Sequence, residues 1–356
     1  MELLIVNHRD PFHPKAGGAE HDLYETARRL VKRGVEVTWL SEEVKGRPKE
    51  EELDGIKVVR KGNELTLHLY APLEARKHEM VMDSIAHAVP FLSFLTNDCT
   101  FAKIHHVHQE VVKYELSPLM AFAVRQAEKL SKFYRKVVVP SNATKRDAIS
   151  MLGIPEDRIT VIPEGIDLDK YRPGDKSEEP FILWLHRVKK YKNPFMAIEA
   201  FELARAMGLK KDVKLVMAGG GDLEPQLREE VKKHDGVVYL GKVSEEEKLK
   251  LLRSAWLFLS TSFIEGWGLS VLEASASGTP TIAFAVGGLN DVIKDGVNGW
   301  LVEYGDVKGM ARKIVEVFSN EGTLKRAWET SRREAEKYSW DRTAEEFYHY
   351  IRKLEC

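Results

Sequence analysis

Cysteine and glutamine are scarce in this chain, and no stretch of it is apolar enough to span a bilayer. The two cysteines among 356 residues, Cys99 and Cys356, are too few for a disulfide framework or a cysteine metal site and favour a reducing compartment. The chain has three glutamines, and this scarcity is typical of thermophilic proteins but carries no functional information. No run approaches the roughly 20 apolar residues of a membrane-spanning helix, and no secretory leader opens the chain. We therefore expect a cytoplasmic protein that does not cross a membrane.

The chain also lacks an excess of either charge. Its 54 basic and 55 acidic residues leave a formal net charge of -1, which argues against nucleic acid as the main ligand and makes any basic patch a local one. No short-period repeat is present, which excludes a solenoid. With 43% hydrophobic residues, the chain is long enough to form two domains of ordinary size, each with its own core.

Two parts of the sequence begin with the same pattern of buried strand, polar turn and helix. The first has an apolar strand at 1–7, helical spacing at 20–34 and another strand at 35–41. The second begins with the strand 180–186 and repeats this plan through residue 219. The repetition predicts an α/β protein made of two doubly wound, Rossmann-like halves.

The predicted boundary between the halves is the segment 162–180, where prolines, glycines and charges interrupt the apolar periodicity. We expect this segment to act as a hinge. The predicted domains are residues 1–163 and 176–338. A terminal helix in residues 339–356 follows, and the sequence leaves open on which half it packs.

The most informative segment is EGWGLSVLE, in which seven residues separate Glu265 from Glu273. Gly266, Trp267 and Gly268 stand between the first carboxylate and the expected helix, and the glycines suit close approach of a ligand to the backbone. A helix that opens after such a turn offers N–H groups to a phosphate, while carboxylates accept hydrogen bonds from sugar hydroxyls. The segment therefore predicts nucleotide-sugar binding, although the spacing alone also fits a charged surface helix.

Glycines follow two of the other predicted strands. Gly17 and Gly18 lie between the first strand and its helix, where they let the backbone contact a diphosphate or a sugar, or simply permit a tight turn. Gly219 begins a GGGDLE turn after the strand 213–218. This turn lacks the third glycine of the dinucleotide fingerprint, so it gives no support for an NAD site.

Three histidines, His105, His106 and His108, follow the apolar strand 99–104, where strand ends of a doubly wound sheet line the ligand cleft. No carboxylate or cysteine pattern in the sequence completes a ligand set, and alternate residues of a strand point to opposite faces. We therefore expect no metal at this cluster. Packing inside the protein is the alternative role for each imidazole.

Taken together, these segments resemble the retaining GT-B glycosyltransferases of the large family that contains sucrose synthases, bacterial glycogen synthases and phosphatidylinositol mannosyltransferases (glycosyltransferase family 4, group 1). The resemblance spans nearly the whole chain. In the first half it rests on the segments 13–37, 104–110 and 137–167. In the second half it rests on the basic residues Arg187 and Lys192, the GGG turn and the two glutamates. It implies two Rossmann-like domains facing across a cleft, with the acceptor bound by the N-terminal domain and the nucleotide sugar by the C-terminal one.

The resemblance also implies roles for single residues. Glu265 would face the hydroxyls of the donor sugar, and Glu273 would hold the ribose diol by charge-assisted hydrogen bonds. His105 would line the donor-sugar pocket, with His106 as the alternative. The backbone near the phosphate and sugar would come from Gly17, Gly18, Gly266, Trp267, Gly268, Leu269 and Ser270, and the walls of the nucleotide site from Gly219, Lys242 and Val243.

Arg187 and Lys192 stand where the family commonly has Gly-Arg followed by Lys-Gly. The resemblance implies that these two cations stabilise the negative charge that grows on the departing β-phosphate, in place of a metal ion. The sequence departs from the family pattern by His186 and Asn193 in place of the two glycines. Lys189 and Lys190 remain alternatives to Lys192, and a solvated lysine-rich turn is the alternative to a site.

The expected function is the metal-independent, retaining transfer of a hexosyl group from a nucleoside-diphosphate sugar to a sugar or lipid-linked acceptor, without a cofactor. A nucleotide-sugar epimerase, a phosphorylase and a non-catalytic sensor are the alternatives. The basic segment 124–136, with Phe133 and Tyr134, and the apolar segment 87–95 could rest on the inner membrane face, although a solvated face explains them too. The donor base, the acceptor and the oligomeric state cannot be read from the sequence.

Overall fold

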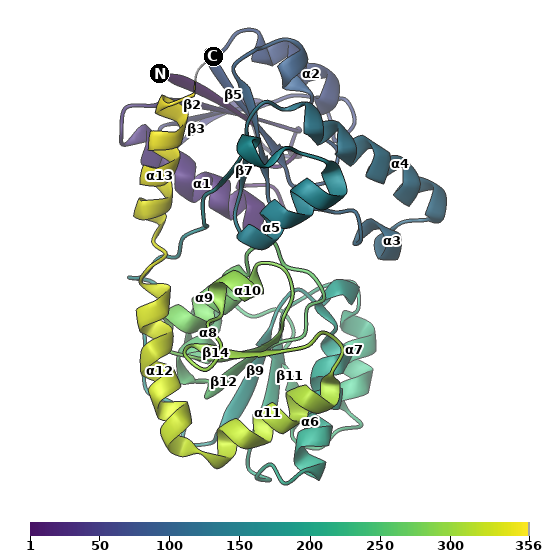
Figure 1. Ribbon diagram of the computed structural model, residues 1–356, viewed down its shortest axis with the longest axis vertical. Helices are drawn as coiled ribbons and strands as arrows, with labels where there is room; N and C mark the ends of the chain where they lie inside the picture. Colours follow the sequence, from purple (N-terminus) through teal and green to yellow (C-terminus); the bar gives the residue numbers. More distant parts are fainter. Residues whose placement is uncertain (355–356) are drawn as a thin grey trace. The chain divides into compact units, whose positions relative to one another are not determined.

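The computed structural model describes residues 1–354, which form two compact units (Figure 1). One unit contains Met1–Gly165 and the chain from Trp340 onward, and the other contains Ile166–Ser339. No helix among the described residues is both long enough and apolar enough to cross a membrane. Of the two cysteines, Cys99 is partly buried, and Cys356 lies outside the described residues.

The first unit is built on an eight-stranded sheet with the order β3-β4-β2-β1-β5-β6-β7-β8. Its strands are β1 (Glu2–Val6), β2 (Glu36–Ser41), β3 (Glu50–Leu53), β4 (Ile56–Arg60), β5 (Met80–Ile85), β6 (Thr100–Ile104), β7 (Val137–Val139) and β8 (Ile159–Val161). Neighbouring strands are parallel except for β3, which pairs antiparallel with β4. The predicted doubly wound half is confirmed, with an antiparallel edge that the sequence analysis did not anticipate.

Helices cover both faces of this sheet because successive residues of each strand point to opposite sides. In β1, Leu3 and Ile5 pack against α1 (Gly18–Val31), whereas Leu4 and Val6 pack on the side of α2 (Leu67–Ala75). Before the second unit come also the α-helices α3 (Val112–Glu115), α4 (Pro118–Glu128) and α5 (Asn142–Asp147).

The last helix, α13 (Trp340–Arg352), belongs to the first unit, which resolves the alternative that the sequence left open. Its buried Phe347 and Ile351 join the core between α1 and the sheet. Figure 1 shows α13 in yellow beside the purple α1, although these helices are far apart in the sequence. The N-terminal half is therefore completed by the C-terminal end of the chain.

The second unit contains a six-stranded, fully parallel sheet with the order β11-β10-β9-β12-β13-β14. Its strands are β9 (Phe181–Leu185), β10 (Lys214–Ala218), β11 (Val237–Tyr239), β12 (Leu257–Ser260), β13 (Thr281–Phe284) and β14 (Gly299–Val302). Its helices are α6 (Pro194–Ala206), α7 (Glu224–Val231), α8 (Glu245–Ser254), α9 (Leu269–Ala276), α10 (Leu289–Val292), α11 (Val307–Ser319) and α12 (Glu321–Ala335).

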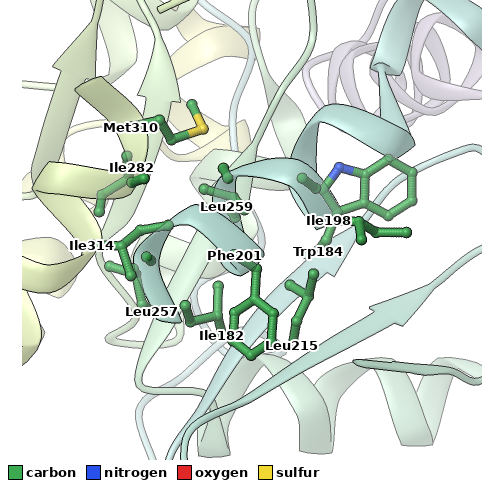
Figure 2. Close-up of a cluster of buried hydrophobic side chains, with 14 of the residues drawn as sticks. Ile182, Trp184, Ile198, Phe201, Leu215, Leu257, Leu259, Ile282, Met310 and Ile314 are labelled. Atoms are coloured by element: carbon green, nitrogen blue, oxygen red, sulfur yellow. The ribbon is translucent and has the colours of Figure 1, made fainter. Parts of the chain in front are cut away.

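Two apolar layers hold this second sheet between its helices. Ile182 and Trp184 of β9 face the layer formed with α6 and α11, which Figure 2 shows around Phe201, Met310 and Ile314. The intervening residues of β9 face the layer formed with α8, α9 and α10. Because both faces are covered, the loops at the carboxyl ends of the strands remain as the place where a ligand meets the sheet.

Candidate functional site

The candidate donor site lies at the carboxyl ends of β9 and β12. These strands are neighbours, but the chain runs from β9 to β10 on one side and returns to β12 on the other, so the strand order reverses between them. Doubly wound sheets bind ligands at this type of position. The 3-10 turn Lys190–Lys192 follows β9, and Asn193, with a φ of 47°, is the N-cap of α6.

A buried ion pair joins the two strand ends. The ammonium of Lys192 contacts Oε1 of Glu265, and the hydroxyl of Ser262 donates to the same oxygen at 2.8 Å. The Lys192 and Glu265 side chains are 10% and 13% exposed. The hydroxyl of Thr261 donates to the carbonyl of Lys192 at 2.9 Å and so holds the Lys190–Lys192 turn against the end of β12. No hydrogen bond from the described residues reaches Oε2 of Glu265, so this oxygen remains available to a ligand.

The other basic residues of this loop lie in different surroundings. Arg187 is exposed and donates to the hydroxyl of Tyr191 at 3.1 Å, and the Lys192 ammonium lies 5.1 Å from the centroid of the Tyr191 ring. Lys189 pairs with Asp222 at 3.0 Å, and Lys190 is exposed. Of the three lysines considered from the sequence, Lys192 is therefore the one in contact with Glu265.

His186, which departs from the family pattern, is buried between β9, β12 and the start of α9. Its Nδ1 lies 3.3 Å from the hydroxyl of Ser270, and its Nε2 lies 3.4 Å from the carbonyl of Leu259. Burial lowers the pKa of His186 well below its usual value, and the nearby charge of Lys192 lowers it further. The imidazole is therefore neutral at physiological pH and serves as a bridge between elements.

The predicted glycine-rich turn opens α9 beside this ion pair. Gly268 has a φ of 106°, and a Cβ there would lie 2.5 Å from the Leu289 side chain. Helix α9 begins at Leu269 and its first turn leaves N–H groups without intrahelical acceptors. Trp267, in contrast, is buried with its ring centroid 5.1 Å from that of Tyr338, so only its backbone is available to a ligand.

The GGG turn and the segment after β11 lie on the other side of β9. Gly219 has a φ of 130°, and a Cβ there would lie 1.8 Å from the carbonyl oxygen of His186. Lys242 is exposed and Val243 is partly exposed, and the Cβ of Lys242 lies 3.6 Å from a Cβ built at Gly220. The turn therefore brings bare backbone, with no side chain, close to the end of β9.

Glu273 is held by two residues that the sequence analysis did not identify. Lys248 of α8 donates to its Oε1 at 2.7 Å, and the hydroxyl of Tyr171 donates to the same oxygen at 2.8 Å. The Glu273 side chain is 13% exposed. No sequence motif links these residues, because Tyr171 and Lys248 lie 102 and 25 positions away from Glu273.

In the first unit, Gly17 caps α1 and Gly18 is its first residue. The N–H of Gly17 donates to the carboxylate of Glu20 at 2.7 Å, so this amide is already satisfied by the helix's own capping. The exposed Gly18 keeps the opening of the helix accessible.

His105, which follows β6, lies in a buried polar cluster that includes Asp22 of α1. Its Nδ1 is 3.6 Å from Asp22 and 3.9 Å from Glu164, and its Nε2 is 3.1 Å from the hydroxyl of Ser84. Lys103 pairs with Asp22 at 2.5 Å. Burial lowers the pKa of His105 to about 4, although Asp22 acts in the opposite direction, so the imidazole is neutral at pH 7.

This cluster corrects one step of the sequence argument about metals. Two carboxylates do approach His105, and the ligand atoms of Asp22, His105 and Glu164 lie within 4.8 Å of one another. However, the buried ammonium of Lys103 already neutralises Asp22, and a metal ion would have to displace it. The donor set therefore fits a salt-bridged polar cluster better than a metal centre.

The neighbouring histidines differ from His105. His108 is fixed inside the protein, with Nδ1 3.2 Å from Glu128 and Nε2 3.1 Å from the carbonyl of Ala86. His106 is partly exposed, and its ring centroid lies 3.8 Å from that of His108. A packing role accounts for His108, whereas His105 and His106 remain candidates.

The first unit also carries an exposed apolar surface on α3, α4 and the turn after α4. It consists of Tyr114, Leu119, Met120, Phe122 and Phe133, and Leu119 and Phe122 are 81% and 59% exposed. The segments predicted for membrane contact fit this surface only in part. The 87–95 segment is largely inside, with Phe91 buried, and Tyr134 is buried with its hydroxyl donating to Asp83.

Comparisons with known proteins agree with this geometry. The model of the glycosyl transferases group 1 matches residues 166–334, and that of glycosyltransferase family 4 matches residues 16–170. The chain belongs to the group 1 glycosyltransferases of family 4. A D-inositol 3-phosphate glycosyltransferase of Nocardia farcinica is 30% identical over 228 residues, which are 59% of this chain and 51% of that protein. The chain thus spans about half the length of the curated relatives it matches.

Solved structures show that this family member has the GT-B fold. Sucrose-phosphate synthase from Thermosynechococcus elongatus superposes with a TM-score of 0.81 at 20% identity, over 99% of this chain and 98% of that one. HepE of Anabaena, solved in complex with UDP-glucose, superposes with a TM-score of 0.79 at 17% identity, over 99% and 100%. At these identities the similarity establishes the fold alone.

Proposed function

We propose that this chain is a metal-independent, retaining glycosyltransferase that moves a hexosyl group from a nucleoside-diphosphate sugar to an acceptor hydroxyl. The observation that carries the proposal is the Lys192–Glu265 pair at the switch point of the second sheet, next to the glycine turn that opens α9. A fixed cation and the first turn of a helix provide positive charge for a diphosphate, and a carboxylate provides an acceptor for sugar hydroxyls.

In the proposed reaction, the bond between the sugar C1 and the β-phosphate oxygen breaks, and its electron pair stays on the phosphate. The acceptor oxygen forms the new bond to C1 on the same face, and its proton passes to the departing phosphate. Arg187 and Lys192 lower the barrier because the phosphate gains negative charge as the bond breaks. Glu265 orients the sugar through its second oxygen, and Glu273 accepts hydrogen bonds from the ribose diol.

We assign the acceptor to the first unit, as the family resemblance implies, and keep Gly17, Gly18 and His105, which follow the carboxyl ends of β1 and β6, as residues near the phosphate and sugar of the donor. Contact of this unit with an anionic membrane surface through Leu119 and Phe122 would suit a lipid-linked acceptor. Lys113, Arg125, Lys129 and Lys132 accompany the apolar residues in the same segment, and apolar side chains with basic neighbours favour the interface of anionic membranes.

Vesicle sedimentation tests the membrane contact. We expect the protein to bind phosphatidylcholine vesicles that contain phosphatidylglycerol, and to bind pure phosphatidylcholine weakly. Leu119→Glu combined with Phe122→Glu abolishes the binding, whereas Met207→Glu, at an exposed position of the second unit, does not. If the wild-type protein sediments with neither kind of vesicle, the proposed membrane contact is wrong, and the donor assignment is unaffected.

Incubation with individual labelled UDP, GDP and ADP sugars, with and without EDTA, tests the activity. We expect slow hydrolysis of one donor that EDTA does not reduce, and release of the sugar first as the anomer present in the donor. Tight binding without turnover would identify a non-catalytic sensor, and a changed sugar still attached to its nucleotide would identify an epimerase. Binding of none of the donors would overturn the proposal.

A further inference from the structure

The ion-pair network around Glu273 links three parts of the second unit. Lys248 comes from α8, Glu273 from α9, and Tyr171 from the segment before β9. The Lys248 ammonium also donates to the Tyr171 hydroxyl at 2.8 Å, so Glu273 Oε1, the lysine and the phenol are in mutual contact. Each partner fixes the position of the other two.

Both donors converge on one oxygen of the carboxylate. No hydrogen bond from the described residues reaches Oε2 of Glu273. Glu265 has the same arrangement, in which a lysine and a hydroxyl both contact Oε1. A carboxylate held in this way has lost its rotational freedom before a ligand arrives, and it presents its second oxygen in one direction.

The backbone around Tyr171 is itself anchored. The guanidinium of Arg332 donates to the carbonyl of Tyr171 at 2.6 Å and to the carbonyl of Ala276, at the end of α9, at 3.1 Å. Arg332 therefore ties the segment that carries the phenol to the helix that carries Glu273. The geometry of the network is set by backbone contacts as well as by side chains.

We propose that Lys248 and Tyr171 are positioning residues that orient Glu273, so that its second oxygen recognises the 2′-hydroxyl of a ribonucleoside diphosphate. The inference rests on the proposed function, because it assumes that Glu273 binds ribose. It goes beyond that function by assigning sugar discrimination to residues outside the predicted motif. A fixed, charged carboxylate forms a strong hydrogen bond with a hydroxyl donor. When the ligand lacks this hydroxyl, the carboxylate oxygen loses its hydrogen bond and binding weakens.

Isothermal titration with UDP, GDP and ADP and with their 2′-deoxy forms measures this discrimination. For the nucleotide that binds, we expect the wild-type protein to prefer the ribose form by about tenfold or more, as for a hydrogen bond to a charged group. Lys248→Met and Tyr171→Phe weaken ribonucleotide binding and reduce the preference to about threefold or less. Lys248→Arg retains part of it because the guanidinium can still donate.

Controls separate positioning from loss of structure. Lys313→Met removes a lysine that pairs with Glu316 at 2.6 Å elsewhere in the same unit, and it should change neither affinity nor preference. Glu273→Gln should abolish the preference, and thermal unfolding checks that each variant is folded. If folded Lys248→Met and Tyr171→Phe keep the full preference, the inference is wrong while the proposed function stands. If the wild-type protein binds no nucleoside diphosphate, the proposed function itself fails.

Discussion

At the scale of single residues, Arg187 and Lys192 carry the same charge in different surroundings. Lys192 is buried and paired with Glu265, whereas Arg187 is exposed and donates to the hydroxyl of Tyr191. A buried pair contributes to both folding and function, because removal of one partner leaves an unpaired charge. An exposed cation next to a phosphate site contributes mainly to function. The two residues therefore allow stability and catalysis to be separated.

We predict that Arg187→Ala lowers kcat for the donor by about 100-fold or more and changes KM little, because the charge acts on the departing phosphate. Its free energy of unfolding should change by less than about 0.5 kcal/mol. Lys192→Met should lower kcat too, and destabilise the protein by about 2–3 kcal/mol. Steady-state kinetics and urea unfolding measure both effects. An unchanged kcat in Arg187→Ala would remove this residue from the site.

Gly219 offers a second prediction, with Gly208 as its matched control. Both have a positive φ, at 130° and 104°, but a Cβ at Gly219 would overlap the carbonyl of His186, whereas nothing lies within 4 Å of a Cβ at Gly208. Gly208→Ala should cost about 1–2 kcal/mol from backbone strain alone. Gly219→Ala should cost at least about 2 kcal/mol more, since the end of β9 must shift. Chemical denaturation measures the difference, and equal losses would show that the clash relaxes easily.

The residues of the site differ in how far the sequence reveals them. Glu265 stands beside Gly266, and this local context predicted a ligand site, whereas Lys192 was singled out by the family resemblance. Lys248 looks like any lysine of a charged helix, and Tyr171 lies in the segment 162–180, which has no apolar periodicity. Their meeting at Glu273 depends on how α8 and α9 pack, which no local pattern encodes. The buried Asp22 that approaches His105 was missed for the same reason.

At the scale of elements, short-range patterns predicted the strands and helices well. The hairpin of β3 and β4 was missed although the sequence contains its signal, Asp54-Gly55, whose φ values of 49° and 80° suit a tight hairpin turn. The apolar spacing of α13 predicted a helix but not its partner. The apolar face of an amphipathic helix can pack in any apolar groove, so tertiary packing decides that α13 packs on the first unit.

The packing of α13 predicts a local effect of mutation. Phe347 is fully buried between α1 and the first sheet, so Phe347→Ala should destabilise this unit by about 3–5 kcal/mol through the cavity it leaves. Hydrogen exchange should speed up in β1, β2, β5 and α1, and change little in β9–β14. Glu345→Ala, on the exposed side of the same helix, is the control. Faster exchange throughout the second unit would contradict the assignment of α13 to the first.

At the scale of the whole molecule, the chain has two separate sets of apolar cores, one in each unit. A ligand that binds one unit stabilises that unit in proportion to its affinity and concentration. The proposed donor contacts would therefore be visible as selective protection of the second unit. The same separation means that a buried ionisable group affects the stability of its own unit first.

Lys176 is such a group in the second unit. Its ammonium donates to the hydroxyl of Thr279 at 2.7 Å and to the carbonyl of Arg253 at 3.1 Å, neither of which supplies a negative charge. Burial lowers the pKa of Lys176 from 10.5 to about 7. Between these two values the unfolded chain binds a proton that the folded protein does not, so this lysine makes stability rise as the pH rises. Below pH 7 the cost of burying its charge is fully present.

We predict that Lys176→Met removes this pH dependence. Relative to the wild-type protein, the variant should gain most in stability near pH 6–7, and the gain should shrink steadily as the pH approaches 10. Urea unfolding at several pH values, followed by hydrogen exchange in β9–β14, measures the difference between the two proteins. Lys313→Met, which removes a lysine from a surface ion pair, should show a difference that varies little over the same range. A gain from Lys176→Met that stays constant from pH 6 to pH 10 would mean that Lys176 keeps its charge in the folded protein.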